Sequence, residues 1–310
     1  MLGNLGAFFA PITLHFVVGV NDASLFKYGF IIGAIVIFMG FANFLIFKDK
    51  YLRLENGDPI GVQPINKELK GQINIDMNKK LDSTEIDRVK VIIFALVISI
   101  VLYMSIEQTT TSMVLLSLYY MNNTIPFTDI VLSPQFYVCL NPLFVAIFSV
   151  GLIKVTDYLA KKNKEPSSIS KLSIGTLMAV IAFICLLIPT YLSSGKMSML
   201  WLVLFNIFLV IAEILIGPIV FSLISKLAPV RHASLMMGTG LAATFVSEIL
   251  AGYFASVFPM PSGETNYLLG LIPISNLSSF IWIFIILIAA IFIIWTVSRG
   301  KIKELMHGEE

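Results

Sequence analysis

The sequence predicts an all-α integral membrane protein, built as a bundle of eight membrane-spanning helices. Of its 310 residues, 57% are hydrophobic and 13% are charged, whereas about a quarter of the residues are charged in a typical soluble domain. The hydrophobic residues form runs of roughly 20, the length that crosses the hydrocarbon core of a bilayer as a helix. The runs show no strand-like alternation, which leaves helices as the way to satisfy backbone groups in lipid. This composition excludes a soluble enzyme.

The predicted spans leave one long polar stretch between the second and the third. We expect spans near residues 1–20, 28–47, 89–120, 136–159, 171–193, 199–225, 233–257 and 277–298. The six spans after the polar stretch are the size of one half of a transporter built from two related bundles. The predicted domains are a two-span remnant of an amino-terminal bundle (1–48), a cytoplasmic linker (49–88), a six-helix carboxyl-terminal bundle (89–298) and a cytoplasmic tail (299–310).

The start of the chain is hydrophobic from its first residues, MLGNLGAFFA. It lacks the positive flank that normally precedes a signal peptide or a helix that starts in the cytoplasm. The first span therefore resembles a helix entered partway, and we expect a truncated or split form of a longer protein.

The lysine and arginine residues predict the orientation of the chain in the membrane. When alternate connections are assigned to the same side, that side holds all but two of the 21 Lys and Arg residues, the exceptions being Lys27 and Lys196. Connections rich in these residues stay in the cytoplasm. We therefore expect a multi-pass protein of the cell's inner (plasma) membrane with both termini cytoplasmic. Topology explains the lysine runs, which give no sign of a nucleic-acid partner.

Three predicted spans each carry a lone carboxylate near mid-depth, at Glu107, Glu213 and Glu248. An acidic residue at that depth costs about 2.5 to 3.5 kcal/mol on insertion scales. One interpretation is a carboxylate that exchanges a proton or binds a cationic substrate group in a water-filled cavity. The other is a protonated side chain hydrogen-bonded to a neighbouring helix. Glu248 shares a helix face with Thr244 and Gly240, at steps of four residues, although small-residue helix packing also explains the latter two.

Two prolines are expected to disturb helices beside polar residues. Pro218 cannot donate a backbone hydrogen bond to Ile214, so a bend or an exposed carbonyl is expected next to Glu213. Pro142 has the same effect next to Asn141. The amide of Asn141 is therefore a candidate for orienting a ligand, and an interhelical hydrogen bond is the alternative.

The sequence predicts neither a metal site nor a cofactor. His15, His232 and His307 have no metal-ligand partner at a suitable spacing, and Cys139 and Cys185 show no redox or metal-binding spacing. No P-loop, nucleophile elbow, zinc motif or nucleotide fingerprint is present. The two cysteines are interpreted as small packing residues.

The polar residues fall within motifs that resemble the proton-dependent oligopeptide transporter (POT) family of the major facilitator superfamily. Six motifs occur in the order expected for that family: NLGAFFAP (4–11), IEQTTTS (106–112), LNPLFV (140–145), EPSSISKLSIG (165–175), AEILIGPIVFSLISKLAP (212–229) and MMGTGLAATFVSEILAG (236–252). The resemblance covers nearly the whole chain. It implies a symporter that uses the proton gradient to bring di- and tripeptides into the cell by alternating access.

The resemblance also implies roles for individual residues, with the eight spans similar to helices five to twelve of a twelve-helix transporter. Glu213 and Asn141 match the helix-ten glutamate and helix-eight asparagine that recognise the amino end of the peptide. Glu107 matches a helix-seven glutamate that pairs with an arginine of helix one during gating and proton coupling. Asn4 and Thr244 match pocket positions of helices five and eleven. Additional candidates are Gln108 and Glu248.

The sequence departs from the family pattern in several places. No counterpart of helices one to four is present, nor of the E-x-x-E-R motif and the helix-four lysine, so Glu107 lacks its expected arginine. Gly240 stands where a pocket tryptophan is usual, Ser247 and Glu248 replace a common Gly-Asn pair, and the linker lacks two extra hydrophobic helices. Two hypotheses remain open. The chain works as a peptide symporter, with another chain supplying the four helices, or it is a non-transporting membrane remnant with residual peptide binding or partner contact.

Overall fold

A computed structural model describes residues 2–18, 25–53, 57, 80–125, 127–129, 131–261 and 263–308. The chain divides into two compact units, one of Met1–Ile12 with Lys80–Glu310 and one of Thr13–Lys79. Most of the predicted linker, the side chain of His15 and both extreme termini lie outside the described residues.

Within the described residues, seven helical segments are long and apolar enough to cross a membrane. The helices are α2 (Phe26–Tyr51), α4 (Ser83–Ile106) with α5 (Ser112–Tyr120), α6 (Leu140–Lys161), α7 (Ser168–Leu192), α8 (Leu200–Leu227), α9 (Ala233–Ser256) and α10 (Leu277–Leu305). A further apolar helix, α1 (Leu2–Val18), is shorter. The predicted all-α membrane architecture is therefore confirmed, and α10 runs seven residues beyond the predicted span.

Short 3₁₀ helices and strands connect these helices. The 3₁₀ segments are η2 (Glu107–Thr109), η3 (Pro134–Cys139) and η4 (Val230–His232). Strand β1 (Met121–Asn122) pairs in parallel with β2 (Met197–Ser198), and β3 (Asn266–Leu268) pairs antiparallel with β4 (Ile272–Ile274). The strands lie between helix ends and tie neighbouring connections together.

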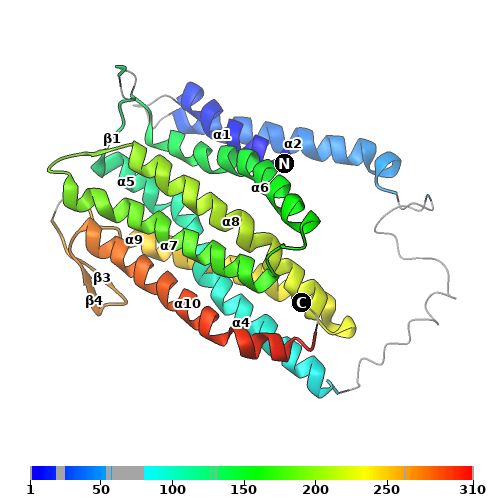
Figure 1. Cartoon of the computed structure of the whole chain (residues 1–310). Coiled ribbons are helices and arrows are strands. Elements are labelled where there is room, and N and C mark those ends of the chain that lie inside the picture. The colour runs from blue at the N-terminus through cyan, green and yellow to red at the C-terminus, as the bar shows by residue number, and fades with distance from the viewer. Residues whose placement is uncertain are drawn as a thin grey trace. The chain divides into compact units, whose positions relative to one another are not determined.

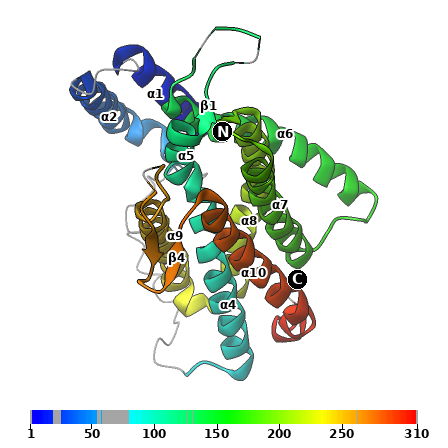
Figure 2. The same ribbon diagram turned by 90° about the vertical axis from the view of Figure 1, so that its left-hand side faces the viewer.

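The core of the bundle forms around α8, which contacts α4, α6, α7 and α9. Figure 1 shows α4, α7, α8 and α10 running side by side, and in the turned view (Figure 2) α10 lies between α4 and α7. Gly175 permits a close approach of α7 to α8, because a Cβ atom there would lie 2.8 Å from Cγ1 of Ile216. Aromatic rings fill the space between α7 and α10, where Phe183 stacks on Phe284 with centroids 4.8 Å apart.

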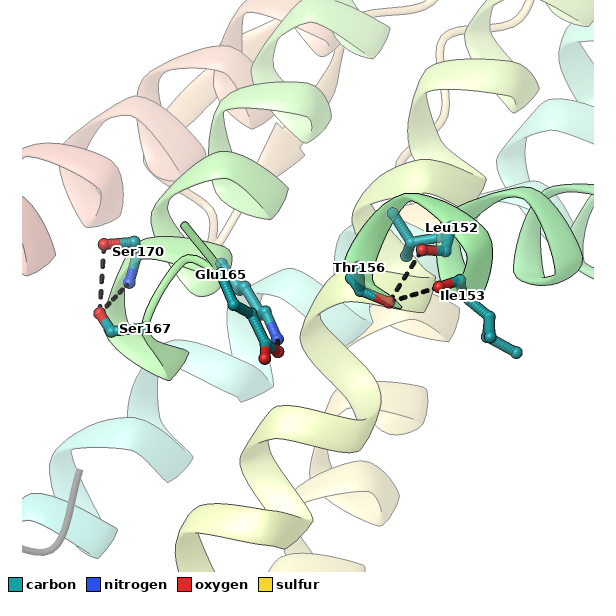
Figure 3. A network of polar contacts seen from close by, with 7 residues as sticks. Leu152, Ile153, Thr156, Glu165, Ser167 and Ser170 are labelled. Carbon is teal, nitrogen blue, oxygen red and sulfur yellow. Dashed lines mark hydrogen bonds and ion pairs between the residues drawn. The ribbon is translucent and has the colours of Figure 1, made fainter. Parts of the chain in front are cut away.

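Helix α7 begins at a capping serine. The hydroxyl of Ser167 accepts a hydrogen bond from the backbone N–H of Ser170 at 3.3 Å, which satisfies one of the unpaired donors of the first turn. Figure 3 shows this cap beside Glu165, whose carboxylate forms an ion pair with Lys171. In the same view Thr156 of α6 donates back to the carbonyls of its preceding turn, so its hydroxyl is satisfied within the helix.

Two polar contacts join helix ends on the side where α4 begins, and the first of them is an ion pair. Arg231, in the turn between α8 and α9, binds the carboxylate of Glu85 at 2.5 Å, and the Arg231 side chain is 7% exposed. His307, after α10, lies 3.3 Å from the carboxylate of Asp87. These contacts fix the start of α4 against the ends of its neighbours, and α4 leads directly into Glu107, the first residue of the candidate site.

Candidate functional site

Glu107 lies at an interruption of a membrane-spanning helix. The sequence predicts one continuous span over 89–120, but α4 ends at Ile106, η2 follows, and α5 starts at Ser112. The threonines explain the difference, because their hydroxyls compete for backbone carbonyls. Thr109 donates to the carbonyl of Ile106 at 2.9 Å, and Thr111 donates to that of Glu107 at 3.0 Å. The freed carbonyls are thereby satisfied without water, as a bilayer requires.

The Glu107 carboxylate lies beside a hydroxyl and partly reaches the surface of the bundle. Oγ1 of Thr110 donates to Oε2 of Glu107 at 3.3 Å. A 3₁₀ segment within a helix often marks a functional site, and here it places a carboxylate where the α-helical hydrogen bonding is interrupted. Glu107 is half-buried, so its carboxylate can meet both the bundle interior and a ligand or partner outside it.

Asn141 and Glu213 meet across two helices. Nδ2 of Asn141, in the first turn of α6, donates to Oε2 of Glu213 in the middle of α8 at 2.8 Å. The distortion expected at Pro142 is present as the change from η3 to α6, and Pro142 lies in the first turn, where proline is tolerated. Helix α8 continues through Pro218 without a break. The structure therefore brings together these two predicted residues.

Tyr103 is a member of this site that the sequence did not indicate. It lies one helical turn before Glu107 on α4. A Cβ atom added at Gly217, one turn after Glu213, would lie 3.6 Å from the Tyr103 hydroxyl oxygen. The Tyr103 hydroxyl and the Glu213 carboxylate interact electrostatically, as do the carboxylates of Glu107 and Glu213. The sequence does contain one indication of it, because Tyr103 precedes the mid-span Glu107 by four residues, which is about one helical turn.

The exposure of the three predicted residues on α9 increases along one face of the helix. Gly240 is buried, Thr244 is half-buried and Glu248 is exposed. The hydroxyl of Thr244 donates to the carbonyl of Leu241 at 2.8 Å. The carboxylates of Glu248 and Glu107 lie close enough to interact electrostatically. Ser247, next in sequence to Glu248, is fully buried and donates to the carbonyl of Thr244 at 2.6 Å. Glu248 is therefore at the rim of the site, beyond Glu107.

The other two candidates do not join these contacts in the described part of the chain. The Gln108 side chain is fully buried, and its amide donates to the carbonyl of Met104 at 3.0 Å and accepts a hydrogen bond from Ser112. Its polar groups are thus used within its own helix turn. Asn4 is half-buried on α1.

Among the described residues, no group of three His, Cys, Asp or Glu side chains is arranged to hold a metal ion.

The assembled site is an acidic patch with hydrogen-bonding groups on both sides. Its three carboxylates belong to η2, α8 and α9, with the amide of Asn141 beside that of α8. No lysine or arginine occurs in residues 91–153, 197–225 or 232–298, which include these helices at the depth of the site. Such an arrangement can bind an ammonium group through charge-assisted hydrogen bonds. It can also hold a proton on one carboxylate when another is ionised, because the negative charges repel.

Comparison with known proteins identifies the family. The sequence profile of the POT family matches residues 48–269. A di-/tripeptide transporter of Lactococcus lactis subsp. cremoris is 30% identical over 129 residues, which are 41% of this chain and 26% of that protein. The chain therefore aligns with only about a quarter of this relative's length.

Solved structures share the fold over almost the entire chain. A peptide transporter POT in complex with sulfate superposes with a TM-score of 0.78 at 21% identity, over 98% of this chain and 67% of that one. A POT family transporter in complex with 5-aminolevulinic acid gives a TM-score of 0.75 at 20% identity, over 96% of this chain and 67% of that one. The resemblance carried by the six motifs is confirmed, and because the family profile covers well over half of its residues, the chain belongs to the POT family.

Proposed function

We propose that this chain supplies the carboxyl-terminal part of a proton-coupled symporter that takes up di- and tripeptides by alternating access. The contact between Asn141 and Glu213 carries the proposal, because it places a carboxylate and an amide from two helices at one point. The transport of di- or tripeptides by the Lactococcus relative supports the substrate class. In this proposal the protein lies in the plasma membrane with both termini cytoplasmic, and residues 49–88 link the two spans of 1–48 to the bundle of 89–298.

Recognition of the peptide begins with its amino group. Nδ2 of Asn141 is a donor and holds Oε2 of Glu213. The other carboxylate oxygen of Glu213 and Oδ1 of Asn141 are acceptors, which a peptide ammonium with its three N–H donors can use together. A charge-assisted hydrogen bond is roughly twice as strong as a neutral one. Asn4 and Thr244 contribute further pocket contacts in this proposal.

Proton coupling follows from the two interacting carboxylates. Glu107 and Glu213 lie close enough for their charges to repel when both are ionised. A proton on Glu107 therefore favours the ionised Glu213 that binds the ammonium group. The hydroxyl of Tyr103 lies next to α8 and interacts electrostatically with the Glu213 carboxylate. Binding of a proton and of a peptide then support each other, as a symporter requires.

The test uses proteoliposomes that contain this chain together with a second chain supplying four further membrane helices. We expect dipeptide uptake driven by an inward proton gradient, and we expect Glu213→Gln to abolish it. Glu264→Gln is the matched control, because Glu264 is an exposed glutamate in the connection between α9 and α10. Unchanged uptake with Glu213→Gln would remove the assigned role of this carboxylate.

The alternative function is a membrane protein that binds peptide without transporting it, or that serves as a partner for another membrane chain. The chain spans about two thirds of each of these two solved transporters, so its activity by itself is measured directly. Proteoliposomes containing this chain alone distinguish the two. Proton-driven accumulation of dipeptide by the single chain contradicts the alternative, whereas saturable binding without accumulation supports it.

A further inference from the structure

A groove of about 250 Å³ lies between the beginning of α4 and the end of α10. Lys90 and Phe94 line it from α4, and Ser298, Lys301 and Leu305 line it from α10. The two helices pack side by side along this part of the bundle (Figure 2). The groove is apart from the candidate site, which includes none of these residues.

The sequence places the groove where two apolar helices leave the hydrocarbon layer. No charged residue or histidine occurs from Val91 to Ile106 on α4, and none occurs on α10 before Arg299. Lys90 directly precedes the apolar segment of α4, and Lys301 lies two residues beyond Arg299 at the end of that of α10. Lysines at such positions extend their ammonium groups to the level of the lipid headgroups while their methylenes stay on apolar surface.

The apolar walls of the groove continue onto surface suited to acyl chains. Val97 lies one turn beyond Phe94 on α4 and is 57% exposed, and Ile294 lies one turn before Ser298 on α10 and is 50% exposed. The wall itself is firmly held, because Phe94 stacks on Trp295 with centroids 5.9 Å apart and Trp295 donates to the carbonyl of Ile169 at 3.1 Å. A ligand in the groove thus meets a rigid aromatic surface that leads into the membrane.

The charges at the groove favour an anion. Lys90 is 60% exposed and gives one hydrogen bond to Asp87 at 2.8 Å, so an ammonium with three donors keeps donors for a ligand. Asp87 is also in contact with His307. Lys301 is exposed on the facing helix. Asp87 reduces the positive charge near Lys90, which makes Lys301 the stronger of the two contacts.

We propose that this groove binds the phosphate headgroup of an anionic phospholipid from the predicted cytoplasmic leaflet. The groove is smaller than most ligand pockets, which enclose roughly 300 to 1,000 Å³, so it accommodates the headgroup while the acyl chains lie along Val97 and Ile294. A soluble anion would use the lysines alone. The phospholipid uses both the lysines and the apolar walls, which is why the structure favours it. Basic pockets between membrane helices bind anionic lipid headgroups by these same interactions.

The experiment measures binding of phosphatidylglycerol and of phosphatidylcholine with identical acyl chains to the whole detergent-solubilised chain by native mass spectrometry. We expect a clear preference for phosphatidylglycerol. Lys301→Gln leaves the Lys90 to Asp87 pair intact and should lower that preference by roughly fivefold, from about 1 kcal/mol for each lysine near anionic lipid. Lys90→Gln with Lys301→Gln should bring the two lipids close to equal affinity. Lys301→Arg should retain the preference.

The matched control is Lys226→Gln with Lys303→Gln, which removes the same charge from positions that do not line the groove. It should keep the preference of the parent chain. An equal loss in the control and groove variants would overturn the proposal, because binding would then follow net charge. Displacement of phosphatidylglycerol by an equal concentration of inorganic phosphate would also overturn it, since the groove would then take the free anion. Lys301→Gln keeps the test informative if the double variant fails to fold.

Discussion

Nδ2 of Asn141 donates a hydrogen bond to Oε2 of Glu213 at 2.8 Å and joins α6 to α8 between residues 72 positions apart. The two residues hold each other in place in a bundle whose neighbouring side chains are mainly apolar. In the proposed function, the same contact orients the carboxylate toward the amino group of a peptide.

Replacement of Asn141 should weaken peptide binding without unfolding the bundle. Asn141→Ala removes the donor that orients Glu213, and a hydrogen bond to a charged group contributes about 1.5 to 3 kcal/mol. The expected result is a Kd for a neutral dipeptide raised by roughly ten- to a hundredfold, measured by isothermal titration. Ser149→Ala is the control, because Ser149 lies on the same helix and its hydroxyl bonds only within it, to the carbonyl of Val145. Equal affinity in Asn141→Ala and the control would argue against a binding role for the amide.

Glu248 should affect the relative affinity for different peptides more than the affinity for peptides in general. It is exposed at the rim of the site, and its carboxylate interacts electrostatically with that of Glu107. Exposed charge pairs contribute about 0.2 to 1 kcal/mol, so Glu248→Gln should lower the affinity for a lysine-containing dipeptide by at most about fivefold. The affinity for an alanine dipeptide should stay within about twofold. Competition binding with both peptides measures the ratio, and a ratio equal to that of the parent chain would exclude Glu248 from peptide selection.

Gln108 should matter for stability, because its buried amide holds the helix together at the interruption. Gln108→Leu removes the donor to Met104 and the acceptor for Ser112, and each group left unpaired in an apolar environment costs about 1 to 3 kcal/mol. We expect a clearly lower Tm in detergent by thermal unfolding. The Tm of Gln108→Leu is compared with that of Thr110→Val, a substitution two residues away. Thr110 is exposed and touches the Glu107 carboxylate, so this change should leave Tm nearly unaltered and act on proton-driven uptake.

Membrane-spanning helices are easy to predict from the sequence, because lipid surrounds them. The places where such helices are interrupted are difficult to predict. A continuous apolar run is required wherever a helix crosses the bilayer, so the spans over α7, α8 and α9 are predicted to within three residues at each end. The break at Glu107 depends on which hydroxyls bond which carbonyls, and that choice is made in three dimensions. Tyr103 is not predictable from the sequence for a related reason, because only the fold brings its hydroxyl to α8.

The contact between residues of two different helices also could not be predicted from the pattern of residues in the sequence. Composition and spacing marked Asn141 and Glu213 as separate polar residues beside prolines, and only the family resemblance assigned both to one site. Their hydrogen bond depends on the packing of α6 against α8. The site residues therefore remain proposals that the binding experiments test, whereas the helical architecture follows directly from the sequence.

Gly240 should be required for the close packing of α9 on α8. A Cβ atom at this position would lie 2.9 Å from Cδ1 of Ile224 and 3.1 Å from Cε1 of Phe221, so even alanine forces these side chains to move. Overpacking of this kind costs about 1 to 3 kcal/mol, and Gly240→Ala should lower Tm in detergent. Gly238→Ala is the control, because no atom lies within 4 Å of a Cβ atom there, and alanine favours a helix over glycine by up to about 1 kcal/mol. Adding Ile224→Val to Gly240→Ala removes the Cδ1 atom and should restore part of the lost Tm. The same contacts explain why a tryptophan, expected at this position from the family pattern, has no room beside α8 in this chain.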